Sequence, residues 1–238
     1  MKKTAPWLLG GLIVLLLVMT FEESRAGMVI HQVMRDRDGR VSNVVLSGEG
    51  ERLRSDDLDG GLTTVMDFKS DRLVMIDHRS KRYVETKFSR WEKEVTERLK
   101  KELPGITPKR SRIVARKTGE TAVINGFRTV KIEILADGEL IEENWMTREV
   151  ALGDLEKTME RASKGVSREF RSGMEEGREI YEKLKPYGFS ILVKDYSIAY
   201  GLGINVLEVK KIEQKTLEEN LFLAPKGYER ILAEAPKK

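Results

Sequence analysis

The densest group of carboxylates in the sequence consists of Asp56, Asp57 and Asp59. These side chains could hold Ca²⁺, but an EF-hand loop beginning at Asp57 needs a bidentate Glu at its twelfth position, where this chain has Phe68. Aspartate is also common in turns, because its side chain bonds to nearby backbone N–H groups. We therefore interpret the three aspartates as a solvated hairpin turn and predict no metal site.

Two histidines, His31 and His78, are the only imidazoles available for general-base catalysis. Asp77 adjoins His78, but neighbouring residues of a strand point to opposite faces, so this carboxylate is poorly placed to orient the ring. The sequence lacks the Gly-x-Ser-x-Gly turn of many hydrolases, and residues 201–203 (GLG) lack the third glycine of a dinucleotide site. These patterns predict a protein that is not an enzyme and holds no cofactor. A hydrolase is the third-ranked alternative and would require either histidine to lie in a cleft beside carboxylates.

Several basic side chains lie in and beside the predicted strands, where they could contact phosphate groups. Acidic residues are interspersed with them, with 43 Lys and Arg against 39 Asp and Glu and a net charge of +4. Few aromatic residues accompany them, so the pattern predicts no nucleic-acid binding. Weak, transient contact with an anionic membrane surface is compatible with it. The residues concerned are Lys81, Arg82, Arg110, Arg112, Arg116 and Lys117.

The first 26 residues have the parts of a secretory signal peptide. Two lysines at positions 2 and 3 precede an apolar stretch at residues 7–21, and small residues lead to a cleavage site after Ala26. The stretch has 15 residues, whereas a spanning helix needs about 20. We therefore prefer a cleaved signal to an uncleaved anchor and predict a periplasmic protein beginning at Gly27. The absence of cysteine excludes disulfides, thiol nucleophiles and cysteine-based metal sites.

Short alternating segments separated by turn residues predict sequential antiparallel hairpins through most of the mature chain. Residues 72–77 are apolar on both faces, which indicates a central strand with a cover on each side. Asn125-Gly126 and Asp137-Gly138 are strong hairpin signals. The predicted strands are residues 28–34, 40–47, 52–56, 62–68, 72–77, 82–87, 112–118, 120–124, 127–135, 140–147, 189–200, 204–213 and 228–232.

Two segments have the apolar spacing of amphipathic helices. The first covers residues 88–103, with Ser89 as a predicted N-cap and Glu92 completing a capping box; a linker at residues 103–108 follows. The second covers residues 152–184, where three glycines leave open a single kinked helix or two helices. One helical turn is expected at residues 217–222.

These elements predict an α+β fold, with the strands in one large antiparallel sheet. A sheet of that size curls, and we expect a half-open barrel whose concave face is covered by the amphipathic helices. Residues 27–238 would form a single domain, with a helical insertion at about 152–184.

Several strand-and-turn patterns resemble a bacterial family of exported proteins of unknown function. They are GERLRSD at 50–56, LVMIDHRSKRYVE at 73–85, INGFR followed by VKIEI at 124–134, ENWMT at 143–147 and VKKIEQKTLEENLFLAPKGYERI at 209–231. That family is similar in fold to the periplasmic lipoprotein carriers and their outer-membrane receptors, the LolA/LolB type. The resemblance implies a curved, incomplete barrel with a helical lid. It transfers no catalytic residues, because the family has none that are agreed.

Large apolar side chains on these elements are candidates for lining a cleft, although such residues most often form ordinary core. Methionine suits varied lipid chains because it is adaptable. The sequence thus predicts a non-enzymatic carrier for a hydrophobic or acylated ligand, such as a lipid, an acyl chain or a lipoprotein. The alternative is an envelope protein-interaction or stress-sensing module that uses an exposed apolar stripe on residues 155–184. The cleft candidates are Val74, Met75, Phe88, Trp91, Trp145, Met146 and Phe170.

Overall fold

The computed structural model describes residues 27–36, 38–102, 112–153, 155–158, 160–161, 171–196 and 204–232. The predicted signal peptide, the predicted linker at 103–108, the turn at 201–203 and the cleft candidate Phe170 lie outside the described residues. Among the described residues, no helix combines the length and the apolar character needed to cross a membrane.

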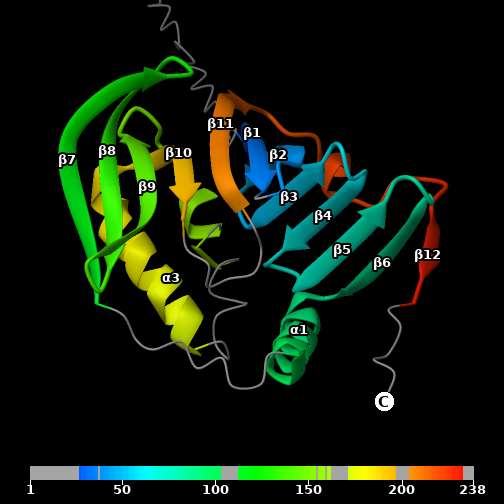
Figure 1. Cartoon of the computed structure of the whole chain (residues 1–238). Coiled ribbons are helices and arrows are strands. Elements are labelled where there is room, and N and C mark those ends of the chain that lie inside the picture. Colours follow the sequence, from blue (N-terminus) through cyan, green and yellow to red (C-terminus); the bar gives the residue numbers. More distant parts are fainter. Residues whose placement is uncertain are drawn as a thin grey trace, which may run out of the picture.

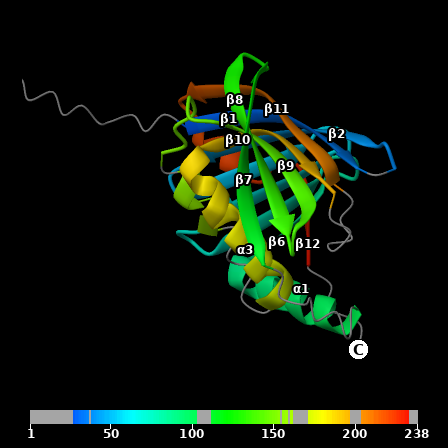
Figure 2. The ribbon, with the colours of Figure 1, turned by 60° about the vertical axis from the view of Figure 1, so that its left-hand side comes forward.

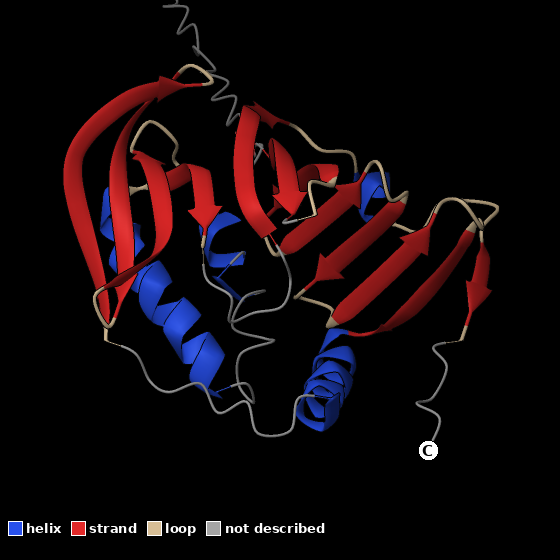
Figure 3. Cartoon of the chain, viewed as in Figure 1, coloured by secondary structure: helices blue, strands red, loops and turns tan. Residues whose placement is uncertain are grey.

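The fold is mostly β, with one open twelve-stranded sheet and few helices (Figure 3). Its strand order is β12-β6-β5-β4-β3-β2-β1-β11-β10-β9-β8-β7. The strands are β1 (Gly27–Asp36), β2 (Val41–Glu49), β3 (Arg52–Asp57), β4 (Leu62–Asp67), β5 (Arg72–Asp77), β6 (Arg82–Lys87), β7 (Ile113–Ile124), β8 (Phe127–Ala136), β9 (Glu139–Thr147), β10 (Phe189–Asp195), β11 (Ile204–Lys215) and β12 (Glu229–Ile231). The helices are α1 (Phe88–Glu102), α3 (Arg171–Leu184), and the short 3₁₀ turns η1 (Lys185–Tyr187) and η2 (Glu219–Phe222); residues 155–158 and 160–161 are also helical.

Two meanders of neighbouring strands make up the sheet, and β1 and β11 join them (Figures 1 and 2). β1 to β6 pair in chain order, and β7 to β11 do the same. β1 then pairs antiparallel with β11 from Gly27↔Lys215 to Asp36↔Ile204. The predicted hairpins are confirmed at Asn125-Gly126 and Asp137-Gly138, where all four residues have the positive φ that such tight turns require.

α1, α3 and the helical residues 155–158 pack on one side of the sheet, which we call the helix face. α1 begins on it with Phe88, which packs with Phe68 and Leu73. α3 contributes Ile180 and Leu184 to a cluster with residues of β7, β8 and β9. Between these two clusters, Met28, Ile30 and Leu53 pack with Leu155 of the helical residues 155–158.

Leu155 sits so close to β2 that only glycine fits beneath it. A Cβ built on Gly48 would lie 2.1 Å from Leu155 Cδ1. Two polar contacts hold the same segment to the turn between β2 and β3. Thr158 Oγ1 donates to the Gly50 carbonyl at 2.5 Å, and Arg161 pairs with Glu51 at 2.6 Å. The segment is therefore fixed over the middle of the helix face.

The opposite side of the sheet, which we call the strap face, is covered by residues 216–228, the C-terminal strap. Leu217 and Phe222 of the strap pack on Val29, Val65, Val74 and Ile76, and all six are buried. Arg54 and Arg72 donate to the carbonyls of Leu221 and Phe222, both at 2.7 Å. The strap thus supplies the second cover that the doubly apolar strand at 72–77 indicated.

The prediction of an entirely antiparallel sheet is wrong at β12. This strand pairs parallel to β6, with Glu229↔Arg82 and Ile231↔Val84. The chain crosses the strap face after β11 and so reaches the edge at β6 without a hairpin. The sequence pattern could not show this, because strand alternation carries no information on pairing direction.

Three element boundaries also differ from the prediction. The segments at 112–118 and 120–124 form one strand, β7, whose register shifts between Lys117 and Thr121 around Gly119 with φ +86°. The predicted strand at 189–200 ends as β10 at Asp195. Within the predicted helix at 152–184, the described helical residues are 155–158, 160–161 and α3.

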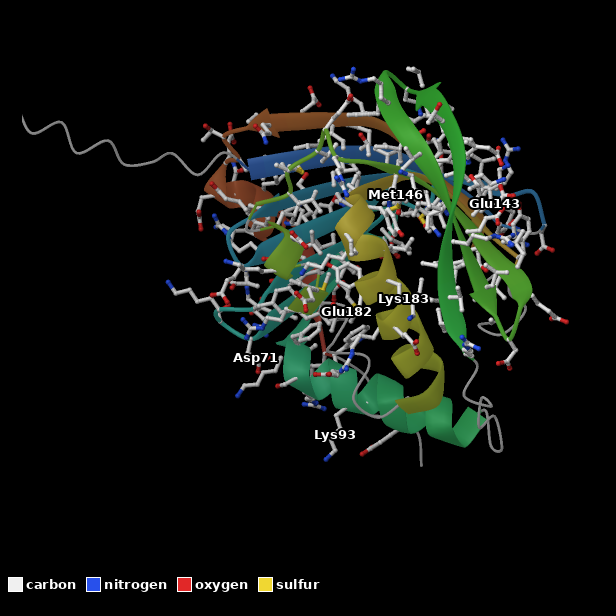
Figure 4. All side chains as sticks on the ribbon, turned by 90° about the vertical axis from the view of Figure 1, so that its left-hand side faces the viewer. Asp71, Lys93, Glu143, Met146, Glu182 and Lys183 are labelled. Carbon is white, nitrogen blue, oxygen red and sulfur yellow. The ribbon has the colours of Figure 1, made fainter. Side chains whose placement is uncertain are left out.

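The first turn of α1 is capped by Asp71, which lies in the turn between β4 and β5 (Figure 4). The helix starts one residue before the predicted N-cap. The Asp71 carboxylate accepts hydrogen bonds from Ser89 N at 2.9 Å and Ser89 Oγ at 2.7 Å. These bonds from Ser89 lower the pKa of Asp71 below its ordinary value of 3.8.

We expect Asp71→Ala to lower the free energy of unfolding by about 1 kcal/mol at neutral pH, the usual cost of a lost cap. Because the folded-state pKa is depressed, this contribution is present above the ordinary carboxyl pKa and disappears as pH falls through the folded value. Urea unfolding across acidic pH would show the two curves converging below about pH 4. Asp38→Ala, in an exposed turn, is the control; a pH-independent difference for Asp71→Ala would contradict the capping role.

Phe222→Ala should remove the main apolar contact of the C-terminal strap, since Phe222 is 1% exposed. We expect a loss of about 3–5 kcal/mol in the free energy of unfolding, typical of a buried phenylalanine. The adjacent Leu223 is 45% exposed, and Leu223→Ala should change stability by less than about 0.5 kcal/mol. Equal losses in denaturant titrations of the two variants would show that the strap is not held by Phe222.

Candidate functional site

A pocket of about 420 Å³ lies on the helix face, between α3, the ends of β9 and β10, residues 150–153 and Glu156. Met146 of β9 is buried at its base, beside α3 (Figure 4). Leu184 forms one wall, and Val150 and Leu152 form part of the other. The remaining lining residues are Ala151, Gly153, Glu156, Tyr181, Lys185, Gly188, Phe189 and Ser190. The lining is thus mainly apolar, with four polar side chains.

The pocket wall next to η1 depends on a glycine. Gly188 has φ +104°, and a Cβ built on it would lie 2.1 Å from the Thr147 carbonyl oxygen. Glycine therefore allows the backbone between η1 and β10 to pass close to the Thr147 carbonyl at the end of β9. Arg148 supports this junction by donating to the Pro186 carbonyl at 2.9 Å.

Three of the polar lining residues meet at one carboxylate oxygen. Lys185 Nζ lies 3.3 Å from Glu156 Oε1, and the Tyr181 hydroxyl donates to the same oxygen at 3.4 Å. The Lys185 and Glu156 side chains are 46% and 38% exposed, so water reaches this ion pair. It joins the helical residues 155–158 to the end of α3 across the pocket.

The environment of this group shifts two pKa values. Burial raises the pKa of the Tyr181 phenol, and the Glu156 carboxylate adds to the rise. The hydrogen bond to Glu156 raises the pKa of Lys185. At neutral pH the group therefore presents a protonated phenol and an ammonium as donors beside Glu156.

The fourth polar lining residue, Ser190, lies deeper, beside Met146. Its hydroxyl has two acceptors within reach, Met146 Sδ at 2.9 Å and the Asn144 amide oxygen Oδ1 at 3.3 Å. A thioether sulfur is a weak acceptor. The single hydroxyl hydrogen is therefore shared between a weak acceptor and a long bond to an amide oxygen.

The structure does not bring the predicted cleft residues together. Met146 lines the pocket. Met75, Phe88 and Trp91 lie in a separate cluster at the start of α1, where the Phe88 and Trp91 ring centroids are 5.8 Å apart.

Val74 and Trp145 face away from the helix face. Val74 is fully buried under the C-terminal strap, on the opposite face from Met75, because consecutive strand residues alternate. Trp145 alternates with Met146 in the same way. Its Nε1 is buried and has no hydrogen-bond partner among the described residues. The six candidates within the described residues are therefore spread over both faces and do not form one cleft.

His78 joins a chain of hydrogen bonds on the strap face. Its Nε2 lies 2.9 Å from Thr63 Oγ1, which donates to Asp56 at 2.5 Å, and its Nδ1 lies 3.0 Å from the Tyr228 hydroxyl. Tyr228 belongs to the C-terminal strap, so this chain anchors the strap. A serine-protease arrangement would place the histidine between the nucleophile and the carboxylate. Here the Thr63 hydroxyl stands between His78 and the Asp56 carboxylate.

His31 and the aspartate group also have local protein partners. His31 pairs with Glu213 across β1 and β11 at 3.1 Å. Asp57 accepts from Gly60 N at 2.8 Å, and Asp59 accepts from Asn43 N at 2.6 Å. The predicted hairpin turn is therefore present, and within the described part of the chain no three His, Cys, Asp or Glu side chains are grouped to hold a metal ion.

Sequence reasoning missed most of the pocket lining. Val150 and Ala151 precede the predicted helix at 152–184, and Leu152 and Gly153 stand at its predicted start, ahead of the apolar stripe that begins at Leu155. The pattern therefore gave no reason to select these four residues. Tyr181 and Leu184 belong to the apolar stripe of the predicted helix. The sequence pattern does not show that this part of the helix lies beside Met146 of β9.

The sequence profile of a domain family described as "Domain of unknown function (DUF4412)" matches residues 28–228. No curated protein matches the chain. Among solved structures, PNGF-II is 10% identical with a TM-score of 0.36, over 88% of this chain and 31% of that one. MucB in complex with MucA(peri) is 12% identical with a TM-score of 0.43, over 88% of this chain and 58% of MucB. This chain spans less than two thirds of either. The match over residues 28–228 shows that the chain belongs to the DUF4412 family.

Proposed function

We propose that the protein is a non-enzymatic binding or carrier protein that holds a hydrophobic or acylated ligand in the pocket beside α3. The observation that carries the proposal is the pocket itself, with a volume of about 420 Å³ and a largely apolar lining. Ligand pockets are commonly about 300–1,000 Å³, mainly apolar, with a few polar groups that fix orientation.

The apolar lining accounts for the driving force. Each methylene of an acyl chain transferred from water to such a site contributes about 0.8 kcal/mol. Met146, Leu184 and Phe189 come from three different elements, so a bound acyl chain would have apolar side chains on several sides. Their separation in sequence makes the site dependent on the folded sheet.

The burial of the helical stripe supports a carrier over the alternative of an envelope interaction module. That alternative needs an exposed apolar stripe on residues 155–184. Leu155, Ile180 and Leu184 are 4%, 6% and 8% exposed, so this part of the stripe packs on the sheet.

Two further parts of the proposal concern export and the shape of the sheet. The signal-like residues 1–26 support export to the periplasm. The size of the sheet supports a half-open barrel whose concave side is the helix face. In that arrangement α3 and the helical residues 155–158 would form the lid over the ligand, and exchange with lipids would need only transient contact with a membrane surface.

The proposal predicts that the purified protein enhances the fluorescence of N-phenyl-1-naphthylamine, an uncharged apolar probe. Ala151→Phe places a ring at the pocket lining and should weaken probe binding at least about tenfold, since it occupies the volume that the probe needs. Val123→Phe is the matched control, because Val123 is 70% exposed on β7. Titration of the probe into each variant measures the two affinities.

Absence of enhancement in the parent protein would contradict the carrier function. Equal binding by Ala151→Phe and Val123→Phe would place the site elsewhere. Thermal unfolding of both variants establishes that any loss of binding is not a loss of folding.

A further inference from the structure

Resting on the proposed function, we infer that the pocket selects single-chain amphiphiles with an anionic headgroup, for which Lys185, Tyr181 and Ser190 are the donors and Glu156 is an internal competitor. The lining residues in question come from α3, η1, β10 and residues 155–158. The site would thus recognise a carboxylate or phosphate head and an acyl tail together.

The pocket already holds one carboxylate, that of Glu156. Lys185 and Tyr181 both approach its Oε1, at 3.3 Å and 3.4 Å. Charge-assisted bonds are ordinarily about 2.7–2.9 Å for N–H···O and about 2.5–2.7 Å for O–H···O, so both contacts are long. The two donors are therefore arranged around an anionic oxygen that binds them loosely, and a ligand carboxylate offers the same chemistry.

Glu156 can give up this position at low cost. Its side chain is 38% exposed, so the carboxylate regains water when it turns away from Lys185. Exposed ion pairs of this kind contribute little to stability. Lys185 and Tyr181 both remain protonated at neutral pH, since their pKa values are raised, and so both stay donors for an incoming anion.

Ser190 supplies a donor deeper in the pocket. Its hydroxyl hydrogen is shared between the Met146 thioether at 2.9 Å, a weak acceptor, and the Asn144 amide oxygen Oδ1 at 3.3 Å. An anionic oxygen within hydrogen-bond distance would be a stronger acceptor than either. The apolar side chains of Met146, Leu184 and Phe189 would then contact the acyl tail of the bound amphiphile.

The test compares amphiphiles of one chain length: dodecanoate, dodecyl phosphate, dodecanol and dodecyltrimethylammonium. Each displaces N-phenyl-1-naphthylamine from the protein. We expect the best anion to bind about tenfold more tightly than dodecanol, the size of one charged hydrogen bond. The ranking of dodecanoate against dodecyl phosphate separates a fatty-acid source from a phospholipid source.

Two substitutions test the assigned roles. Lys185→Gln should abolish the preference for anions and leave dodecanol binding unchanged. Glu156→Gln should strengthen anion binding, because it removes the competitor. Lys183→Gln is the matched control, since Lys183 pairs with Glu179 at 3.4 Å and does not line the pocket.

The outcomes separate this inference from the proposed function. If all four compounds bind equally, or if the cation binds best, the headgroup inference is overturned and the apolar pocket stands. If none displaces the probe in any variant, the proposed function fails as well. A preference for anions that survives Lys185→Gln would refute the role of Lys185.

Discussion

The antiparallel pairing of β1 with β11 is the constraint on which the rest of the structure depends. It joins residues 27–36 to residues 204–215 and so makes one sheet from two meanders. Because β1 lies inside that sheet, both of its faces are buried: Met28 and Ile30 face the helices, and Val29 faces the C-terminal strap. Each face therefore needs its own cover. The two covers define what the protein can do on each side.

The covers differ in chemistry. On the strap face, Arg54 and Arg72 donate to strap carbonyls, and His78 contacts Tyr228. These hydrogen bonds hold the C-terminal strap against the sheet. On the helix face, α3 and the helical residues 155–158 approach the sheet from separate places, and the pocket lies between them. The Glu156–Lys185 pair bridges this gap through water-exposed side chains. The pocket that we propose as the binding site thus lies where two independent covers meet.

The elements of this fold were predictable from sequence because their signals are local. Asn125-Gly126 and Asp137-Gly138 specify hairpins, and the doubly apolar segment at 72–77 indicated a strand with two covers. The pairing of β1 with β11, the parallel β12 and the cap from Asp71 depend on contacts between distant residues, which alternation and propensity do not encode. The choice of Val74 together with Met75 could not define one cleft for a local reason, because adjacent residues of a strand point to opposite faces. The pocket lining at residues 150–153 was not selected because these residues precede the apolar stripe of the predicted helix.

The most direct measurement of the central claim, that an amphiphile binds beside α3, is methyl NMR of the methionine-labelled protein with a spin-labelled fatty acid. Met146 lies in the pocket lining, whereas Met75 lies in a separate cluster at the start of α1. We predict strong relaxation enhancement of the Met146 methyl signal, with a much weaker effect at Met75. Enhancement centred on Met75, or none at any methionine, would contradict this account.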